Sequence, residues 1–362
     1  MSARLAGLVR VVGTGLLGTS IGLALSARGV DVILDDASPA QLRLAIDYGA
    51  GRVVEDSDEP SLIIVCVPPD VTSRVIAAEL TRHPNATVTD VASVKAQVLS
   101  ELQTAHPDLS RYVGGHPLAG RERGGAVSGR ADLFFGRPWV IARHETSNDA
   151  SVRLVEDLVL DVRAVPVEMT AAQHDDAVAL VSHLPQLVAS LLATRLGDAP
   201  AASVSLAGQG LRDTTRIALS APDLWVQILG ANARPVAELL RQLRGDLDAV
   251  IAALDAPDAA GSRRRIAETI ASGNAGVARI PGKHGEDRRY AQITVLVDDT
   301  PGELARLLTE IGELGVNMED LRLEHSPGAQ VGLAEISVVP DVEPLLISDL
   351  TARGWRISEA TR

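Results

Sequence analysis

A short apolar strand that runs directly into three glycines constrains this chain most. Residues 9–18 read Val-Arg-Val-Val-Gly-Thr-Gly-Leu-Leu-Gly, which is the spacing of a dinucleotide-binding turn between a strand and a helix. Gly13 permits the tight turn, Gly15 lets the backbone approach a pyrophosphate, and Gly18 lets the helix pack closely on the strand. The free N–H groups of the helix then point at the phosphate. The sequence therefore predicts a dinucleotide site that includes Gly13, Gly15, Leu16, Leu17 and Gly18.

The residues after this turn favour NAD over NADP as the cofactor. A second apolar strand ends at Asp35 and Asp36, about 20 residues further on, where an acid binds the ribose hydroxyls of NAD. Two carboxylates repel a 2′-phosphate, and the next three residues include no arginine to hold one. Either aspartate is a candidate ribose ligand. Val67, at the end of the predicted strand 62–67, is a further candidate cofactor contact.

Composition and charge exclude several classes of protein. The formal net charge of −13 argues against nucleic acid as a partner, because binding a polyanion needs clustered Lys and Arg. The only cysteine, Cys66, cannot form an intramolecular disulfide, which suits a reducing cytosol. The N-terminus does not read as a signal peptide, and no apolar run approaches the ~20 residues that span a membrane. We expect a cytoplasmic enzyme with no membrane contact and no metal site.

The pattern of elements predicts an α/β protein with three parts. Strands alternate with helical stretches in the first part, which predicts a doubly wound, parallel, Rossmann-type sheet; the expected strands are 9–13, 31–34, 62–67, 87–91 and 139–142. Helical spacing then continues from about Met169 to about Ala271, followed by linker-like segments at 272–276 and 281–285. A small α+β module follows, with strands expected at 292–297 and 334–338 and a helix at 302–314. The predicted domains are 1–168, 169–284 and 285–362.

Two residues of the sheet part are candidates for chemistry. Ser93 follows a predicted strand at the carboxyl edge, where open α/β sheets bind ligands, so it is placed near a nicotinamide. His116 stands in Gly-Gly-His-Pro-Leu-Ala-Gly, which we interpret as a proline-fixed loop. An imidazole can take a proton near neutral pH, so His116 is the candidate general base. The alternative is a loop histidine without a role.

The helical part adds a histidine and two arginines. His183 lies in Ser-His-Leu-Pro-Gln, a break in a helical run, where a polar side chain needs a partner or a cavity. Arg212 and Arg216 are four residues apart, one helical turn, so both can face one site, and guanidinium groups bind carboxylates with two parallel hydrogen bonds. A satisfied core histidine and a solvated arginine face are the alternatives.

Taken together, these motifs resemble the prephenate dehydrogenase family, which also includes arogenate dehydrogenases. The resemblance covers nearly the whole chain and rests on motifs that occur in the family's order: the glycine turn, residues 90–95, Gly-His-Pro-Leu-Ala-Gly followed by Glu122, Ser-His-Leu-Pro, Arg-Asp-x-Thr-Arg, and Trp225. The C-terminal segments 295–305 and 315–318 resemble an ACT domain, a small amino-acid-sensing fold.

The resemblance implies a reaction and a set of roles. His116 accepts the proton of the substrate's ring hydroxyl while hydride leaves the same carbon for NAD, and Ser93 hydrogen-bonds that hydroxyl and the histidine. Loss of carbon dioxide then makes the ring aromatic. Arg216 grips a substrate carboxylate and His183 lies beside the substrate. The groups expected at the mouth of the site are Glu122, Arg212 and Asp213.

One departure from the family pattern leaves the substrate open. Gln186 stands where the family commonly has a second histidine, and a glutamine is neutral at every pH. The substrate is therefore prephenate or arogenate, with a preference for prephenate because the motif holds no acid to pair with an ammonium. The competing hypotheses are a dehydrogenase for another small acid and a catalytically silent amino-acid sensor.

The resemblance also implies regulation and assembly. Tyrosine is the expected feedback ligand, bound near Asp299, Gly302 and Asn317 across a dimer interface, although a module kept only for dimerisation is the alternative. The long apolar helices, with segments such as 177–181 and 187–196, predict a homodimer built on the helical part.

Overall fold

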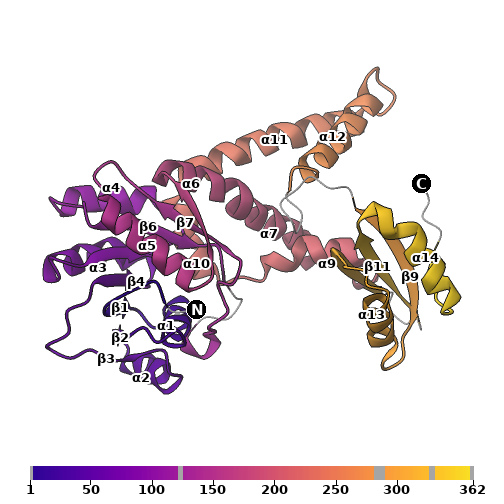
Figure 1. Ribbon diagram of the computed structural model, residues 1–362. Helices are drawn as coiled ribbons and strands as arrows, with labels where there is room; N and C mark the ends of the chain where they lie inside the picture. Colours follow the sequence, from indigo (N-terminus) through magenta and orange to yellow (C-terminus); the bar gives the residue numbers. More distant parts are fainter. Residues whose placement is uncertain (1–2, 121–124, 281–289, 326–330, 359–362) are drawn as a thin grey trace. The chain divides into compact units, whose positions relative to one another are not determined.

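The computed structural model describes residues 3–120, 125–280, 290–325 and 331–358. The chain divides into two compact units, one of residues 1–193 and 217–242 and the other of residues 194–216 and 243–362. The first unit contains a large sheet and its helices, and the second contains further helices and a small sheet (Figure 1). Each unit is described by itself below.

The first unit is built on an eight-stranded sheet of order β3-β2-β1-β4-β5-β6-β7-β8. Its neighbours pair in parallel except β6 and β7, which are antiparallel, so the expectation of a wholly parallel sheet is wrong at one place. Pro138–Ala142 runs back beside Tyr112–Pro117, and among the described residues between these two strands the helical ones form only the short 3-10 turn Ala126–Ser128. The strands are β1 (Val9–Val12), β2 (Val32–Asp35), β3 (Arg52–Val53), β4 (Leu62–Val65), β5 (Thr87–Asp90), β6 (Tyr112–Pro117), β7 (Pro138–Ala142) and β8 (Val165–Met169).

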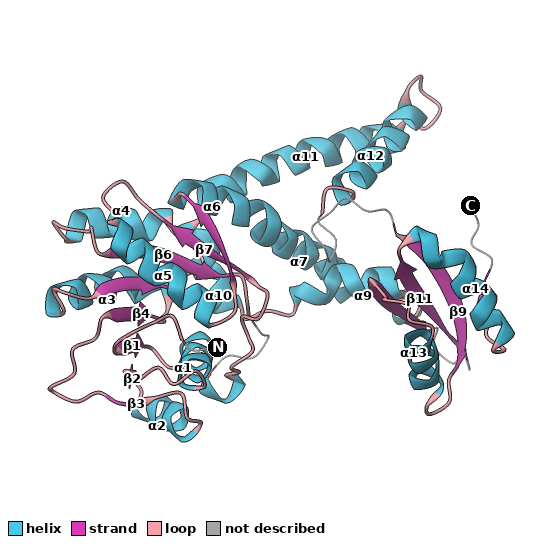
Figure 2. Ribbon diagram, in the orientation of Figure 1, coloured by secondary structure: helices cyan, strands magenta, loops and turns pink. Residues whose placement is uncertain are grey.

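Helices cover both faces of this sheet, which confirms the doubly wound architecture (Figure 2). Alternate residues of the central strands point to opposite cores, so that Leu62 and Ile64 pack on one side and Ile63 and Val65 on the other. The first core takes side chains from α1 (Leu16–Ser26), α2 (Pro39–Asp47) and α5 (Asp149–Asp161), and the second from α3 (Pro69–Arg82) and α4 (Ala96–Ala105). The carboxyl ends of β1, β4, β5 and β6 therefore meet at one edge.

A continuous helical run follows the sheet. It comprises α6 (Ala171–Val178), a π-helical turn η2 (Ala179–His183) and α7 (Leu184–Gly197). The expected break at Pro185 does not occur, because the wide π turn precedes it and a proline near a helix start has no N–H to satisfy. The remaining helical elements are η1 (Ala126–Ser128), α8 (Ala201–Val204), α9 (Gln209–Thr215), η3 (Arg216–Ala218), α10 (Pro222–Ala231), α11 (Ala233–Asp255) and α12 (Ser262–Val277).

By length and composition alone, the helical run 171–197 could cross a membrane. The prediction that no apolar run reaches this length is therefore wrong. Helices of this length and composition also occur in the cores of soluble proteins. Its exposed apolar side chains include Leu180, Val181 and Leu191, at 55%, 65% and 59% exposure. An exposed apolar face of this kind is typical of a surface that contacts another protein.

The predicted linker at 272–276 is wrong. These residues lie within α12, whose last residues include Gly273, Asn274 and Gly276. Glycine and asparagine have low helix propensity, but an established helix carries a few such residues at about 1 kcal/mol each. The second linker-like segment, 281–285, lies outside the described residues.

The C-terminal module is a βαββαβ sandwich in the second unit. Its sheet has the order β10-β11-β9-β12 with every neighbouring pair antiparallel, and α13 and α14 share one core with β9 and β11. Strict alternation of burial along β11 shows that one face of the sheet is packed against the helices. The elements are β9 (Ala291–Asp298), α13 (Glu303–Glu313), β10 (Asp320–His325), β11 (Val331–Val338), η4 (Pro340–Val342), α14 (Glu343–Ala352) and β12 (Arg356–Ser358). This order is that of a ferredoxin-like fold.

Candidate active site

The glycine turn after β1 has the geometry that its sequence indicates. Gly13 has φ +98°, a conformation that favours glycine, and a Cβ there would overlap the Cys66 carbonyl. A Cβ on Gly18 would overlap the Gly13 carbonyl oxygen, so this residue must be glycine for α1 to pack on the turn. Gly15 has no protein atom within 4 Å of a Cβ position, and it is the residue from which α1 begins. The turn thus leaves open space at the helix N-terminus, where a pyrophosphate would lie.

The structure distinguishes the two aspartates after β2. Asp36 bonds directly to the turn: its Oδ2 accepts from the Thr14 N–H at 2.6 Å and from the Thr14 hydroxyl at 2.8 Å. Asp35 instead accepts from the buried Arg10 guanidinium at 2.6 Å, and Arg10 also binds Glu79. We therefore propose Asp36 as the ribose ligand, with Asp35 serving to neutralise Arg10. Val67 lies against the same turn, since its Cγ1 is 3.2 Å from the Cβ position of Gly13.

Substitution separates these two roles. Asp36→Ala removes the carboxylate at the turn and is expected to weaken NAD binding by about tenfold or more, the loss of roughly one charge-assisted hydrogen bond. Asp35→Ala is expected to leave NAD affinity within about twofold and to lower Tm, because Arg10 loses a partner. Fluorescence titration of NAD measures the first effect and thermal unfolding the second. A weaker NAD complex only in Asp35→Ala would reverse the assignment.

His116 lies on strand β6 rather than in a loop, so that part of the prediction is wrong. The two glycines before it mark close packing: a Cβ on Gly114 would lie 3.2 Å from the Lys95 side chain, and one on Gly115 would overlap the Asp90 carbonyl. Glycine within a strand indicates such a close approach. The pair lets β6 pass directly over the end of β5, and it brings His116 to the edge where the glycine turn lies.

A buried ion pair lies beneath this part of the site. The Lys95 ammonium donates to Asp90, whose other carboxylate oxygen accepts from the Tyr112 hydroxyl at 2.8 Å. All three side chains are almost fully buried. Burial is the main cause of a pKa of Tyr112 well above its usual value, and the Asp90 charge adds to it. The cluster is satisfied internally and joins β5, β6 and the segment before α4.

His116 bonds to a second histidine that the sequence reading did not select. Its Nδ1 lies 2.8 Å from Nε2 of His174, and Nδ1 of His174 lies 2.7 Å from Oδ1 of Asp175. The ring of His174 is fully buried. Burial lowers the pKa of His116 well below its usual value, and the neighbouring His174, Lys95 and His183 lower it further. A histidine with a lowered pKa is neutral at physiological pH and ready to accept a proton.

Ser93 lies between β5 and α4, where it is partly buried. The resemblance implied a hydrogen bond between Ser93 and His116, but within the described residues His116 Nδ1 bonds to His174 instead. The placement of Ser93 at the carboxyl end of β5 still puts it on the same sheet edge as the glycine turn. Its contact with cofactor or substrate stays a prediction.

His183 is buried at the end of the π turn and is held from one side. The Asn232 amide N–H group donates to the Asp175 carbonyl at 2.8 Å and lies 3.1 Å from Nδ1 of His183. Because that amide nitrogen is a donor, Nδ1 of His183 accepts and the ring proton is on Nε2. Trp225 contacts the ring edge-on, with centroids 5.9 Å apart. His183 therefore presents an N–H donor, and burial lowers its pKa.

The other predicted substrate ligands differ in their surroundings. Gln186 is buried, donates to Ser190 at 3.3 Å and accepts from Ser220 at 3.2 Å, so its amide joins α7 to the segment before α10. Arg212 and Arg216 are exposed on α9 and η3, which belong to the second unit, and their place in the site stays a prediction. Glu122 lies outside the described residues.

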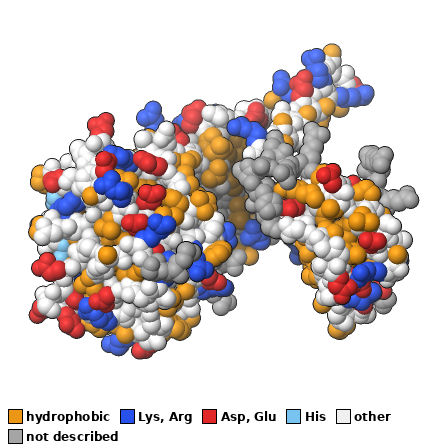
Figure 3. Space-filling view, in the orientation of Figure 1, with side chains coloured by type: hydrophobic (Ala, Val, Ile, Leu, Met, Phe, Trp, Pro, Cys, Tyr) orange, Lys and Arg blue, Asp and Glu red, His pale blue; other side chains and the backbone are white. Residues whose placement is uncertain are grey.

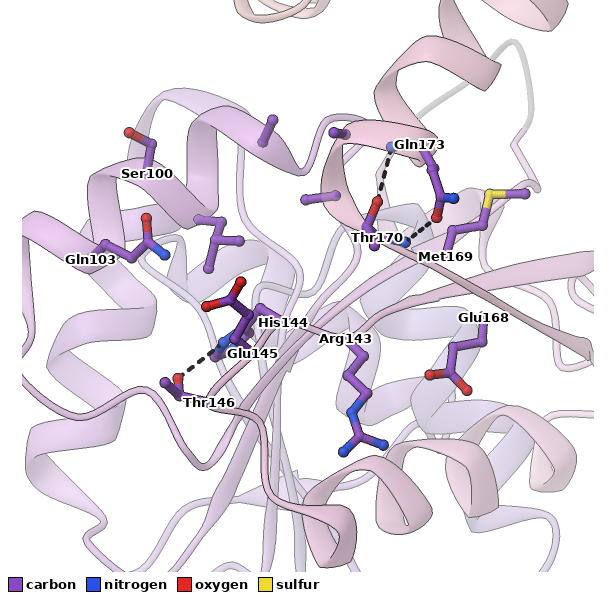
Figure 4. Close-up of a pocket in the computed structure, with 14 residues that line it drawn as sticks. Ser100, Gln103, Arg143, His144, Glu145, Thr146, Glu168, Met169, Thr170 and Gln173 are labelled. Carbon is purple, nitrogen blue, oxygen red and sulfur yellow. Dashed lines mark hydrogen bonds between the residues drawn. The ribbon is translucent and has the colours of Figure 1, made fainter.

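A separate open cavity of about 850 Å³ lies beside this region, between α4, the end of β7 and the start of α6 (Figure 4). It contains none of the predicted site residues. Its polar groups bond to one another, as Thr146 does to His144 and Thr170 to Gln173. Within residues 3–120, 125–280, 290–325 and 331–358, no group of three or more His, Cys, Asp or Glu side chains is placed to hold a metal ion.

Comparison with known proteins identifies the family. The model of the prephenate dehydrogenase nucleotide-binding domain matches residues 21–168, and that of the prephenate dehydrogenase dimerization domain matches residues 170–268. A probable prephenate dehydrogenase, NovF of Streptomyces niveus, is 36% identical over 353 residues, which are 95% of this chain and 98% of that protein. The chain belongs to the prephenate dehydrogenase family.

Other members agree in sequence and in structure. Prephenate dehydrogenase of Bacillus subtilis is 26% identical over 92% of each chain. The Aquifex aeolicus prephenate dehydrogenase in complex with hydroxyphenyl propionate and NAD+ matches 75% of this chain and 99% of its own, with TM-score 0.66 and 25% identity. Synechocystis arogenate dehydrogenase matches 74% of this chain and 99% of its own, with TM-score 0.62 and 26% identity. The glycine turn of this chain fits a dinucleotide, in agreement with the nucleotide-binding domain that the first family model describes.

Sequence reasoning missed His174, Asp175 and Asn232 as parts of the site. The adjacent His-Asp pair at the start of the helical run was a usable signal. Polar side chains that are buried among apolar ones need hydrogen-bond partners. Asp90 and Lys95 are the first and last residues of the motif at 90–95, but their pairing was not predicted. Their opposite charges five residues apart, directly after an apolar strand, could have indicated a buried pair.

Proposed function

We propose that the protein oxidises prephenate with NAD and releases carbon dioxide, forming 4-hydroxyphenylpyruvate in tyrosine biosynthesis. The observation that carries this proposal is that the glycine turn, Ser93 and His116 lie at the carboxyl ends of β1, β5 and β6, where burial lowers the pKa of His116. These strands run parallel, so their carboxyl ends lie at one edge of the sheet. The edge thus offers a cofactor turn and a base together.

The chemistry follows from the residues at this edge. His116 accepts the proton of the substrate hydroxyl, and Ser93 donates a hydrogen bond to the same oxygen. NAD, when bound, accepts the hydride from the carbon that carries this hydroxyl. The C–C bond to the ring carboxylate then breaks, carbon dioxide leaves, and its electron pair completes the aromatic ring. His183, whose Nδ1 accepts from the Asn232 amide, contributes a further N–H donor at Nε2.

The substrate carboxylates require cations. Arg216 and Arg212 are the proposed ligands, with Glu122 at the mouth of the site, because a guanidinium fork binds a carboxylate through two hydrogen bonds. Arg216→Ala is expected to raise KM for the substrate about tenfold or more and to change kcat less, since it removes binding that substrate and transition state share. Steady-state kinetics with varied substrate checks this. A normal KM would assign the carboxylate to another residue.

A rate assay with prephenate and arogenate offered separately tests the function. We expect NADH formation with prephenate to be faster, because Gln186 is already bonded to Ser190 and Ser220 and presents no charge to an ammonium group. Faster turnover of arogenate would make tyrosine the product. Turnover of neither substrate, in protein that binds NAD, would contradict the proposal and favour another small acid or a silent sensor.

The lowered pKa of His116 gives a pH prediction. The base must be unprotonated to act, so kcat/KM falls only when the pH drops through the pKa of His116 in the free enzyme. That pKa lies below the ordinary value of 6.5, chiefly because of burial. We expect kcat/KM to hold its plateau through pH 7 and its acid limb to lie below pH 6.5. An acid limb above pH 7 would contradict the placement of the base at His116.

We also propose that tyrosine binds the C-terminal module as a feedback ligand. Asp299 and Gly302 lie after β9, and Gly302 has φ +97° at the start of α13, whereas Asn317 lies before β10. The strand register places these two loops at opposite ends of the sheet, about six residues or roughly 20 Å apart. One site can therefore include all three residues only if a second copy contributes one loop. Unchanged inhibition by tyrosine after removal of residues 285–362 would contradict this proposal.

The proposed assembly is a cytoplasmic homodimer through the segment that matches the dimerization domain. The exposed apolar side chains of α7 and α10 support this, among them Leu191 and Val226 at 59% and 72% exposure. Basic and acidic side chains are interspersed over the visible face of the first unit (Figure 3). Light scattering at working concentration measures the assembly, and a monomer would refute it. Retention of the activity in the soluble fraction of lysed cells tests the location.

A further inference from the structure

The hydrogen bond between His116 and His174 is the first in a series that continues to Asp175. From His116 Nδ1 it runs to Nε2 of His174 at 2.8 Å, and from Nδ1 of His174 to Oδ1 of Asp175 at 2.7 Å. His174 is fully buried and Asp175 is 3% exposed. Water therefore does not compete for these bonds, and each proton position along the chain is determined by the protein.

The proton positions follow from the carboxylate end. Asp175 accepts from the backbone N–H groups of Lys95 and Ala96, each at 2.8 Å, so its two oxygens act as acceptors. His174 must then donate from Nδ1, and in its neutral form it accepts at Nε2. The nitrogen opposite, Nδ1 of His116, must donate in turn. The neutral His116 ring therefore carries its proton on Nδ1 and has an unprotonated Nε2.

The carboxylate end is held rigidly. Asp175 binds the first N–H groups of α4, where the helix dipole favours a negative charge. The start of α6 is held by a capping box in which Thr170 and Gln173 bond reciprocally, as Figure 4 shows. The side-chain amide of Asn232, the residue that follows α10, donates to the Asp175 carbonyl. The pair His174–Asp175 is thus fixed from three elements.

We propose that His174 and Asp175 are positioning residues that hold the His116 ring in the tautomer whose Nε2 accepts the substrate proton. When Nε2 takes that proton, His116 becomes an imidazolium, and the acceptor nitrogen of His174 together with the Asp175 carboxylate stabilises its charge. The proton stays on His116 and no bond within the chain breaks. This inference rests on the proposed function, in which His116 is the base.

Substitution of His174 tests the proposal without disturbing the α4 cap. His174→Phe removes the acceptor and is expected to lower kcat by about 100-fold, with KM and the Kd of NAD within about threefold. His174→Gln retains a carbonyl acceptor of similar reach and is expected to keep kcat within about tenfold of the wild type. A structural role alone would lower Tm in both variants without this order in kcat. Retention of full kcat by His174→Phe would overturn the proposal.

The tautomer itself can be read by ¹⁵N NMR of histidine-labelled protein, with His116 assigned from the spectrum of His116→Asn. We expect Nδ1 of His116 to be protonated in the wild type, and this preference to be lost in His174→Phe, which offers Nδ1 no acceptor. Wild-type His116 protonated on Nε2, or a doubly protonated His174, would overturn the proposal.

Two comparisons separate this inference from the proposed function. The double variant His116→Asn, His174→Phe is expected to lose no more activity than His116→Asn alone, because residues that act as a unit are not additive. His144→Gln is the matched control: His144 is another partly buried histidine, bonded to the Tyr112 carbonyl. It is expected to retain kcat. A wild type inactive on prephenate and arogenate would contradict the function, while the tautomer of His116 would still test whether His174 and Asp175 position its ring.

Discussion

His116→Asn is expected to lower kcat by about 10²–10⁴-fold, the range that a positioned general base contributes. The asparagine keeps a polar group of similar size near His174 but cannot accept a proton at neutral pH. KM for the substrate and the Kd of NAD are expected to stay within about threefold, because the variant removes an interaction needed only in the transition state. Steady-state rates and NAD titration on the same preparation measure both quantities.

The same variant should also change the pH dependence. Since the acid limb of kcat/KM is attributed to His116, the residual activity of His116→Asn is expected to lack that limb. His144→Gln provides the control for loss of a partly buried histidine. Retention of wild-type kcat by His116→Asn would move the base elsewhere, and a large loss of NAD affinity would show that the substitution had disturbed the sheet edge.

Local sequence patterns predicted the parts of the fold that depend on a few neighbouring residues. The glycine turn, the strands next to it and the C-terminal module's β9, α13 and β11 have alternating or apolar runs bounded by breakers, whereas β10 was not predicted. Strand β6 was missed because Gly114 and Gly115 read as loop residues. Glycine is required at both positions because Lys95 and Asp90 lie close to the backbone there. This contact joins distant segments, so no local pattern contains it.

The candidate site shows the same division. His116 and Ser93 could be selected because they follow or end strands at the ligand-binding edge. The partner of His116 could not be selected, because His174 lies 58 residues away and only the packing of α6 against α4 brings it to the ring. Likewise, Asp35 and Asp36 are equivalent in sequence, and only the contacts with Arg10 and Thr14 distinguish them.

The glycine turn yields the second large effect, because two of its glycines are required for different reasons. At Gly15 a methyl group meets no protein atom within 4 Å, and φ is −68°, so Gly15→Ala is expected to fold with an unchanged Tm. The methyl would instead occupy the space in which the pyrophosphate approaches the backbone. We expect NAD affinity to fall by at least about tenfold, or 1.4 kcal/mol.

Gly18→Ala is the matched variant with the opposite expectation. Its methyl would overlap the Gly13 carbonyl oxygen inside the turn, so α1 must shift away from β1. Overpacking of this kind costs about 1–3 kcal/mol of folding free energy, and thermal unfolding should show a lower Tm. NAD titration and thermal unfolding of both variants therefore separate a glycine required by the ligand from one required by the fold. A destabilised Gly15→Ala with normal NAD affinity would show that the open space at the start of α1 is not the pyrophosphate site.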